Sequence, residues 1–189
     1  MAAQIRGIPG SLRRASFNRA LLRAAIELAP AGMTIEIFEG MADLPLYNAD
    51  VEAAGDPEPV TTWKAAIARA DALLIATPEY NHGVPGVLKN AINWASRPPG
   101  NCVLNGKPAA LMGGSPGGTG TARAQLALRQ SFIFTDTRTL LQPEVLMSRV
   151  HEKIDASGRL TDERTRAAIR QLLEALAHWS ARTGATRAS

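Results

Sequence analysis

The chain has 189 residues, a formal net charge of +4, and a composition of 46% hydrophobic and 20% charged residues. That length fits one globular domain with a sizeable core. The basic residues are spread along the chain and only 5% of residues are aromatic, whereas a nucleic-acid-binding surface usually carries a basic stripe. We therefore expect no nucleic-acid partner.

The sequence also lacks the patterns of export, membrane insertion and metal binding. No apolar run approaches the length of about 18 residues that a membrane span needs, and no signal peptide is expected at the start. Cys102 is the one cysteine, which excludes an intramolecular disulfide and fits a reducing compartment. His82, His151 and His178 lie far apart, without the spacing of a metal site. We expect a cytoplasmic protein with no membrane partner and no metal.

Short strand-like runs alternate with longer helical runs along the chain. In chain order, the patterns predict a strand at 4–8, a helix at 17–28, a strand at 33–38, a helix at 61–70 capped by Thr61 or Thr62, a strand at 72–77, a helix at 86–96, a strand at 108–113, a helix at 121–133, a strand at 139–142 and a helix at 162–182. This alternation is typical of an α/β protein with a parallel sheet. We expect one domain over residues 1–189, with one irregular surface excursion at 39–59 and a frayed tail at 183–189.

Three loops with unusual composition follow the first, third and fourth strands. They are "PGSLRRASFN", "PEYNHGVPG" and "GGSPGGTG". In a five-stranded sheet ordered 2-1-3-4-5, those three strands are neighbours. Ligands of such sheets bind beyond the carboxyl ends of the strands, where the strand order reverses. The three loops therefore predict one shared site.

The first loop has the composition of an anion site. A helix N-terminus offers free N–H groups to an anion, Ser11, Ser16 and Asn18 add short polar groups, and Arg13 adds a planar fork that matches phosphate. The alternative is that Ser16 merely caps the helix and that the arginines are solvated. The loop matches neither the P-loop nor the dinucleotide glycine pattern, so a monophosphate fits better than a longer phosphate chain.

The other two loops are suited to a flat ligand. The second loop holds two prolines and two glycines, so it can keep a fixed shape and expose backbone amides to a heterocycle. Tyr80 is either a stacking surface or core, Glu79 is either solvated or in contact with a sugar hydroxyl, and His82 is either a proton donor or a surface residue. The glycines of the third loop either let a planar ligand approach the backbone or form an ordinary flexible turn.

The stretches "GSLRRASFN", "TPEYNHGVPGVLKNAINW" and "GGSPGGTGTARAQLALRQ" resemble the NADPH-dependent FMN reductase family, and within it the branch of bacterial chromate, quinone and azo-dye reductases. The resemblance covers about residues 4–180. It implies a flavodoxin-like three-layer sandwich with a five-stranded parallel sheet, non-covalent FMN, and NADPH or NADH as hydride donor. It also implies a small-molecule electron acceptor such as a quinone, an azo compound, chromate or free flavin.

The resemblance also implies which residues bind the cofactor. The phosphate would be held by Ser11, Arg13, Ser16 and Asn18 with Phe17 alongside, and the isoalloxazine would be bordered by Pro78, Glu79, Tyr80, Asn81, Ser115 and Gly117. No catalytic side chain is expected, because the flavin itself accepts the hydride. Pro9 and the pair His82–Gly83 depart from the family pattern.

A homodimer or homotetramer is implied as well, with Arg123 and Glu144 at a subunit contact. The alternative is that both are ordinary surface charges. Two rival functions stay open. One is a flavodoxin-type electron carrier, which the basic, aromatic-poor composition disfavours, and the other is a non-redox protein that binds a phosphate-bearing ligand.

Overall fold

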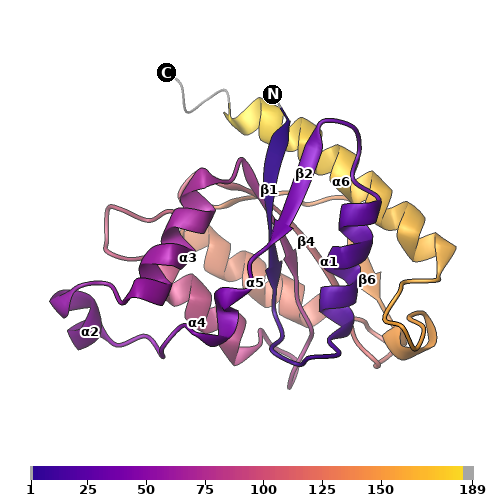
Figure 1. Ribbon diagram of the computed structural model, residues 1–189, viewed down its shortest axis with the longest axis horizontal. Helices are drawn as coiled ribbons and strands as arrows, with labels where there is room; N and C mark the ends of the chain where they lie inside the picture. The colour runs from indigo at the N-terminus through magenta and orange to yellow at the C-terminus, as the bar shows by residue number, and fades with distance from the viewer. Residues whose placement is uncertain (1, 185–189) are drawn as a thin grey trace.

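A computed structural model describes residues 2–184 as a parallel sheet covered by helices on both faces (Figure 1). The strands are β1 (Ala3–Pro9), β2 (Met33–Ile37), β3 (Ala72–Ala76), β4 (Pro108–Gly114), β5 (Arg138–Thr139) and β6 (Val145–Met147). Their order is β2-β1-β3-β4-β5, and β6 also pairs with β4. This confirms the predicted α/β class and the strand order, with a sixth strand added.

Six α-helices and two short 3₁₀ helices lie within the described residues. They are α1 (Phe17–Glu27), η1 (Gly40–Ala42), α2 (Ala49–Ala54), α3 (Glu58–Arg69), α4 (Gly86–Ala95), α5 (Ala122–Phe134), η2 (Val150–Glu152) and α6 (Glu163–Gly184). Helices α1 and α6 cover one face of the sheet, and α3, α4 and α5 cover the other (Figure 1). No helix of residues 2–184 is both long enough and apolar enough to cross a membrane.

The two central strands are buried along their whole length, because helices cover both of their faces. All five residues of β3 and all seven of β4 are buried, as their continuous apolar runs predict. Trp63, Trp94 and Phe132 fill the layer between the sheet and α3, α4 and α5. This core fixes the carboxyl ends of β1, β3 and β4 beside one another, where the three unusual loops begin.

The far edge of the sheet differs from the prediction. The single strand expected at 139–142 is wrong: β5 pairs with the first residues of β4, and the separate β6 pairs with its last residues. Pro143 lies between the two segments and has no N–H to donate to a ladder. The chain therefore leaves β4 after Thr139 and returns to it at Val145.

Two other boundaries also differ. Helix α3 begins at Glu58 and is preceded by Pro57, so neither Thr61 nor Thr62 caps it. A proline in the first turn is preorganised for a helix, and an acid there suits the helix dipole. The excursion 39–59 contains η1 and α2. Of the predicted frayed tail, residues 183–184 belong to α6 and residues 185–189 lie outside the described part of the chain.

Candidate active site

The three loops surround a cavity of about 340 Å³ at the carboxyl edge of the sheet. The first loop contributes Ser11, Arg13, Ser16, Phe17 and Asn18; the second contributes Pro78, Glu79 and Tyr80; the third contributes Gly114, Ser115 and Pro116. The structure therefore brings nine of the eleven predicted site residues together. Asn81 and Gly117 are not among the residues that line the cavity. Gly114 and Pro116 were missed, although both flank Ser115 in the same glycine-rich loop.

The N-terminus of α1 lies at this cavity, because Ser16, Phe17 and Asn18 line it. Ser16 is the N-cap, and its Oγ accepts a hydrogen bond of 3.3 Å from the backbone N–H of Arg19. The first turn of α1 contains no acidic residue. Ser11 Oγ accepts from the N–H of Arg13 at 3.3 Å and lies 3.4 Å from the hydroxyl of Tyr80. The positive end of the helix dipole is thus left without a negative side chain of its own.

Arg13 adds a full positive charge at the same place. Its guanidinium lies over the ring of Phe17, 4.6 Å from the ring centroid. The Arg13 side chain is exposed, and within residues 2–184 it has no ion-pair partner. Stacking on Phe17 orients the guanidinium while leaving its N–H groups free for an anion.

Asn18 connects the first loop to the third. Its side-chain amide donates to the carbonyl of Gly114 at 2.9 Å, and its Oδ1 accepts from the N–H of Gly114 at 2.9 Å. Asn18 is 2% exposed. The oxygen and one N–H of the amide are therefore engaged by the protein backbone. The predicted contact of Asn18 with a phosphate stays a prediction, and the residue has the additional task of holding two loops together.

Glu79 is buried rather than solvated, and its contact with a sugar hydroxyl stays a prediction. Its carboxylate accepts hydrogen bonds from the backbone N–H of Arg123 at 3.0 Å and of Ala124 at 3.1 Å, and from the Arg123 guanidinium at 3.1 Å. The side chain is only 7% exposed. Burial alone would raise the pKa of Glu79, but the bonds from Ala124 and Arg123 outweigh it and hold the pKa below its ordinary value. Glu79 therefore caps α5 as an ionised carboxylate.

Close packing explains part of the glycine-rich loop. A Cβ atom at Gly113 would lie 2.2 Å from the carbonyl oxygen of Thr77 and 2.3 Å from Oγ1 of Thr121. Glycine is required there because β4, β3 and the start of α5 are in contact, and not because a ligand approaches. Gly117 has open space apart from Ser115 Oγ at 3.6 Å, so packing does not require a glycine there and the close approach of a ligand stays a prediction for that residue.

The tip of the second loop is a tight turn. Asn81 and His82 have φ angles of 50° and 60°, and the N–H of Gly83 donates to the carbonyl of Tyr80 at 2.9 Å. Both residues are exposed, and neither lines the cavity. The turn leaves His82 outside the set of residues that line the cavity.

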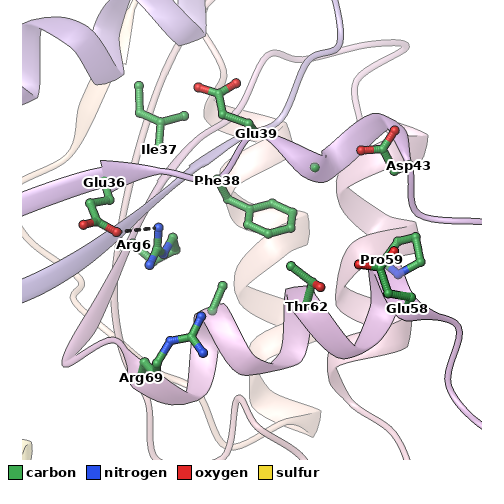
Figure 2. A pocket seen from close by; sticks show the side chains of 12 residues that line it. Arg6, Glu36, Ile37, Phe38, Glu39, Asp43, Glu58, Pro59, Thr62 and Arg69 are labelled. Atoms are coloured by element: carbon green, nitrogen blue, oxygen red, sulfur yellow. Dashed lines mark ion pairs between the residues drawn. The ribbon is translucent and has the colours of Figure 1, made fainter.

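A larger cavity, of about 610 Å³, lies at the outer edge of the sheet between β2 and α3 (Figure 2). Its lining contains the cations Arg6 and Arg69, with Glu36 paired to Arg6 at 3.0 Å. Three further carboxylates belong to Glu39, Asp43 and Glu58. Acids outnumber cations four to two, so this cavity disfavours a phosphate. The smaller cavity at the three loops is the better candidate site for the predicted chemistry.

Comparisons with known proteins agree with the motifs. The sequence profile of the family described as NADPH-dependent FMN reductase matches residues 3–152. An NAD(P)H-dependent FMN reductase of Pseudomonas aeruginosa is 51% identical over 93% of this chain and 94% of its own. A 2-hydroxy-1,4-benzoquinone reductase of a Burkholderia species is 44% identical over 95% and 97%.

A solved structure agrees as well. The flavoenzyme FerB, an NAD(P)H:(acceptor) oxidoreductase of Paracoccus denitrificans, superposes with a TM-score of 0.87 at 37% identity, over 96% of this chain and 99% of its own. Sequence and fold therefore match over almost the same span of residues. The chain belongs to the NADPH-dependent FMN reductase family, which confirms the predicted class of FMN-dependent NAD(P)H oxidoreductases.

Proposed function

We propose that the cavity at the three loops binds FMN, with the phosphate at the N-terminus of α1 and the ring between the second and third loops. The observation that carries this assignment is the uncompensated positive end of α1, with Ser11, Arg13 and Ser16 around it. The ring would be bordered by Pro78, Glu79, Tyr80, Asn81, Ser115 and Gly117. The site belongs to a single FMN-binding domain spanning residues 1–189.

Bound FMN supplies the hydride-accepting and electron-donating chemistry. The side chains that line the cavity would hold FMN in one orientation. The carboxylate of Glu79 is engaged by α5, and the hydroxyl of Tyr80 lies beside Ser11. Neither is placed as an isolated acid or base, so the proposal assigns no catalytic side chain.

The proposed acceptor is a quinone. Relatives named quinone reductase, from Pseudomonas putida and Escherichia coli, are 42% and 41% identical to this chain, and the Burkholderia relative is named for a hydroxybenzoquinone. A flat aromatic acceptor and the nicotinamide of the donor would take turns on one exposed ring face. Azo compounds, chromate and free flavin are the other acceptors of the proposal.

The flavin itself tests the assignment. We expect FMN rather than FAD when the bound flavin is extracted and separated by chromatography. Arg13→Ala should weaken FMN binding about 10- to 100-fold, because charged hydrogen bonds contribute about 1.5–3 kcal/mol. Arg14→Ala is the matched control, since Arg14 does not line this cavity. Equal losses for the two variants would mean that the phosphate is placed wrongly.

Steady-state kinetics test the shared ring face. Varied NADPH and quinone should give parallel double-reciprocal lines, as expected when donor and acceptor alternate at one site. Bleaching of the yellow protein by NADPH separates this function from a non-redox phosphate binder, and turnover with a quinone separates it from an electron carrier. Intersecting lines would indicate a ternary complex and contradict the shared face.

We also propose a homodimer or homotetramer built on α5. Three apolar side chains of this helix are largely exposed, Leu126 at 64%, Ile133 at 81% and Phe134 at 83%. Leu126 and Ile133 are seven residues apart and share a face of the helix. Such a face is suited to an equivalent face of a second copy. Arg123 begins the same helix, so the contact would adjoin the proposed ring site.

Light scattering tests the oligomer. Ile133→Asp should shift the mass toward the monomer, because a buried carboxylate would be introduced into the contact. Leu46→Asp is the control, since Leu46 is 84% exposed but lies in the excursion 39–59. A wild-type monomer at micromolar concentration would overturn this part of the proposal. A cytoplasmic location, consistent with the single cysteine, is proposed with it.

A further inference from the structure

A second cavity adjoins the proposed FMN site on the side of β2. It has a volume of about 360 Å³ and lies between the first loop and the segment that follows β2. Ser11 and Arg13 line both cavities. The two cavities therefore adjoin at the first loop, and a ligand that reaches over the loop can contact both.

The second cavity carries an excess of positive charge. Arg13, Arg14 and Arg19 contribute three guanidinium groups to its lining, and Glu39 contributes one carboxylate, which leaves a net charge of +2. Arg19 and Glu39 form an ion pair. The cavity at the β2 edge in Figure 2 has the opposite balance. An anion that approaches this end of the molecule is therefore directed to the arginines.

Arg14 has no structural task that would explain its position. Its side chain is exposed, and within residues 2–184 it makes no hydrogen bond, ion pair or ring contact. It lines the second cavity but not the first. An exposed arginine at the rim of a cavity presents the planar fork that binds a phosphomonoester through two hydrogen bonds.

Apolar groups lie beside the cations. Leu12 is 56% exposed, and Met41 and Pro9 also line the cavity. An apolar wall next to a cationic rim is suited to a molecule with a flat base and a phosphate. An inorganic anion would use only the cations and leave Leu12 exposed.

We propose that this second cavity binds the adenosine 2′-phosphate end of NADPH, with Arg14 as the residue that distinguishes NADPH from NADH. The inference rests on the proposed function, because it requires a nicotinamide donor at the adjoining flavin site. The phosphomonoester that only NADPH carries would contact Arg14 and Arg19, and the adenine would lie against Leu12. Arg13, which lines both cavities, would lie between this phosphomonoester and the FMN phosphate and would reduce the repulsion between them.

The experiment compares both donors on the FMN-loaded enzyme. Arg14→Gln should raise KM for NADPH about tenfold and change KM for NADH less than twofold, because the variant loses one charged contact that NADH never makes. Arg170→Gln is the matched control. Arg170 is exposed on α6, so this substitution makes the same charge change outside the first loop. Equal effects of Arg14→Gln on the two donors would overturn the inference.

A binding measurement separates this inference from the proposed function. Calorimetric titration should show that adenosine 2′,5′-bisphosphate binds more tightly than adenosine 5′-monophosphate, and that Arg14→Gln removes the difference. This result does not depend on turnover or on flavin loading. Inorganic phosphate that competes as well as the bisphosphate would overturn the adenosine assignment. An enzyme without flavin would contradict the proposed function, while the titration still decides the second cavity.

Discussion

Helices α1 and α5 both begin at the carboxyl edge of the sheet, yet their N-termini have different electrostatic partners. The start of α5 is neutralised within the chain, because the buried carboxylate of Glu79 accepts from two of its backbone N–H groups and from Arg123. The start of α1 has only the neutral Ser16 as a cap, with Arg13 nearby. A helix N-terminus becomes an anion site only where the protein leaves its charge uncompensated.

The largest effect is expected when α1 is given a carboxylate of its own. Ser16→Asp keeps a good N-cap but places a negative charge where the FMN phosphate would lie. We expect FMN affinity to fall at least about 100-fold, equal to about 2.7 kcal/mol, with little change in thermal stability. Ser16→Asn is the control that caps without charge. Flavin fluorescence titration of the apoproteins checks this, and an affinity for Ser16→Asp within threefold of wild type would contradict it.

The connection between the two regions is tested next. Asn18→Ala removes both hydrogen bonds that join the α1 loop to Gly114 and leaves a buried N–H and a buried carbonyl unpaired. We expect a loss of about 2 kcal/mol in the free energy of unfolding, measured in urea. Asn93→Ala, which breaks an exposed bond to Lys89, should cost much less. Similar losses for the two variants would remove the clamp role of Asn18.

A smaller effect is expected when α5 loses its charge. Glu79→Gln keeps a similar shape but removes the negative charge from the helix start. The free energy of unfolding should fall by about 1 kcal/mol, since charge–dipole contacts in partly buried positions reach about 2 kcal/mol. Glu58→Gln, in the exposed first turn of α3, is the control. It should lower the free energy of unfolding by only a few tenths of the loss expected for Glu79→Gln. If Glu79→Gln left the free energy of unfolding unchanged, the stabilisation of the α5 N-terminus by Glu79 would not be electrostatic.

The smallest effect is the pH dependence of that contribution. Because the pKa of folded Glu79 lies below its ordinary value of 4.5, the carboxylate stabilises the fold above that pH, and its contribution disappears as the pH falls through the folded pKa. The stability difference between wild type and Glu79→Gln should be constant from pH 7 to about pH 5 and should shrink below about pH 4. Urea unfolding across this range measures it, and a difference that grows on acidification would refute the assignment.

Sequence patterns predicted the elements that are determined by local or periodic signals. The buried runs of β3 and β4, the helical spacing of α1 and the three loop compositions were all visible along the chain. The convergence of the loops was also predictable, because the order 2-1-3-4-5 makes their strands neighbours. The start of α3 was missed because proline and an acid, rather than a threonine, begin that helix.

The roles of Glu79 and Asn18 were not predictable in the same way. Glu79 caps a helix that begins 43 residues later, and Asn18 binds the backbone of Gly114, 96 residues away. No short-range pattern specifies such partners, because each depends on which strands lie side by side and how closely they pack. The glycine at position 113 has the same origin, since its neighbours Thr77 and Thr121 come from two other segments.

The sequence by itself determined the class of fold, the family and the loops that form the site, because strand periodicity, turn chemistry and motif order are local properties of the chain. Only the tertiary structure decided which of two helix N-termini stays open to an anion, and that Arg13 lines two cavities whereas Arg14 lines only one of them. The first outcome depends on charge pairing across the sheet edge, and the second depends on the path of the first loop. Pairing of that kind is a property of distances in space, and those distances exist only once the sheet has assembled.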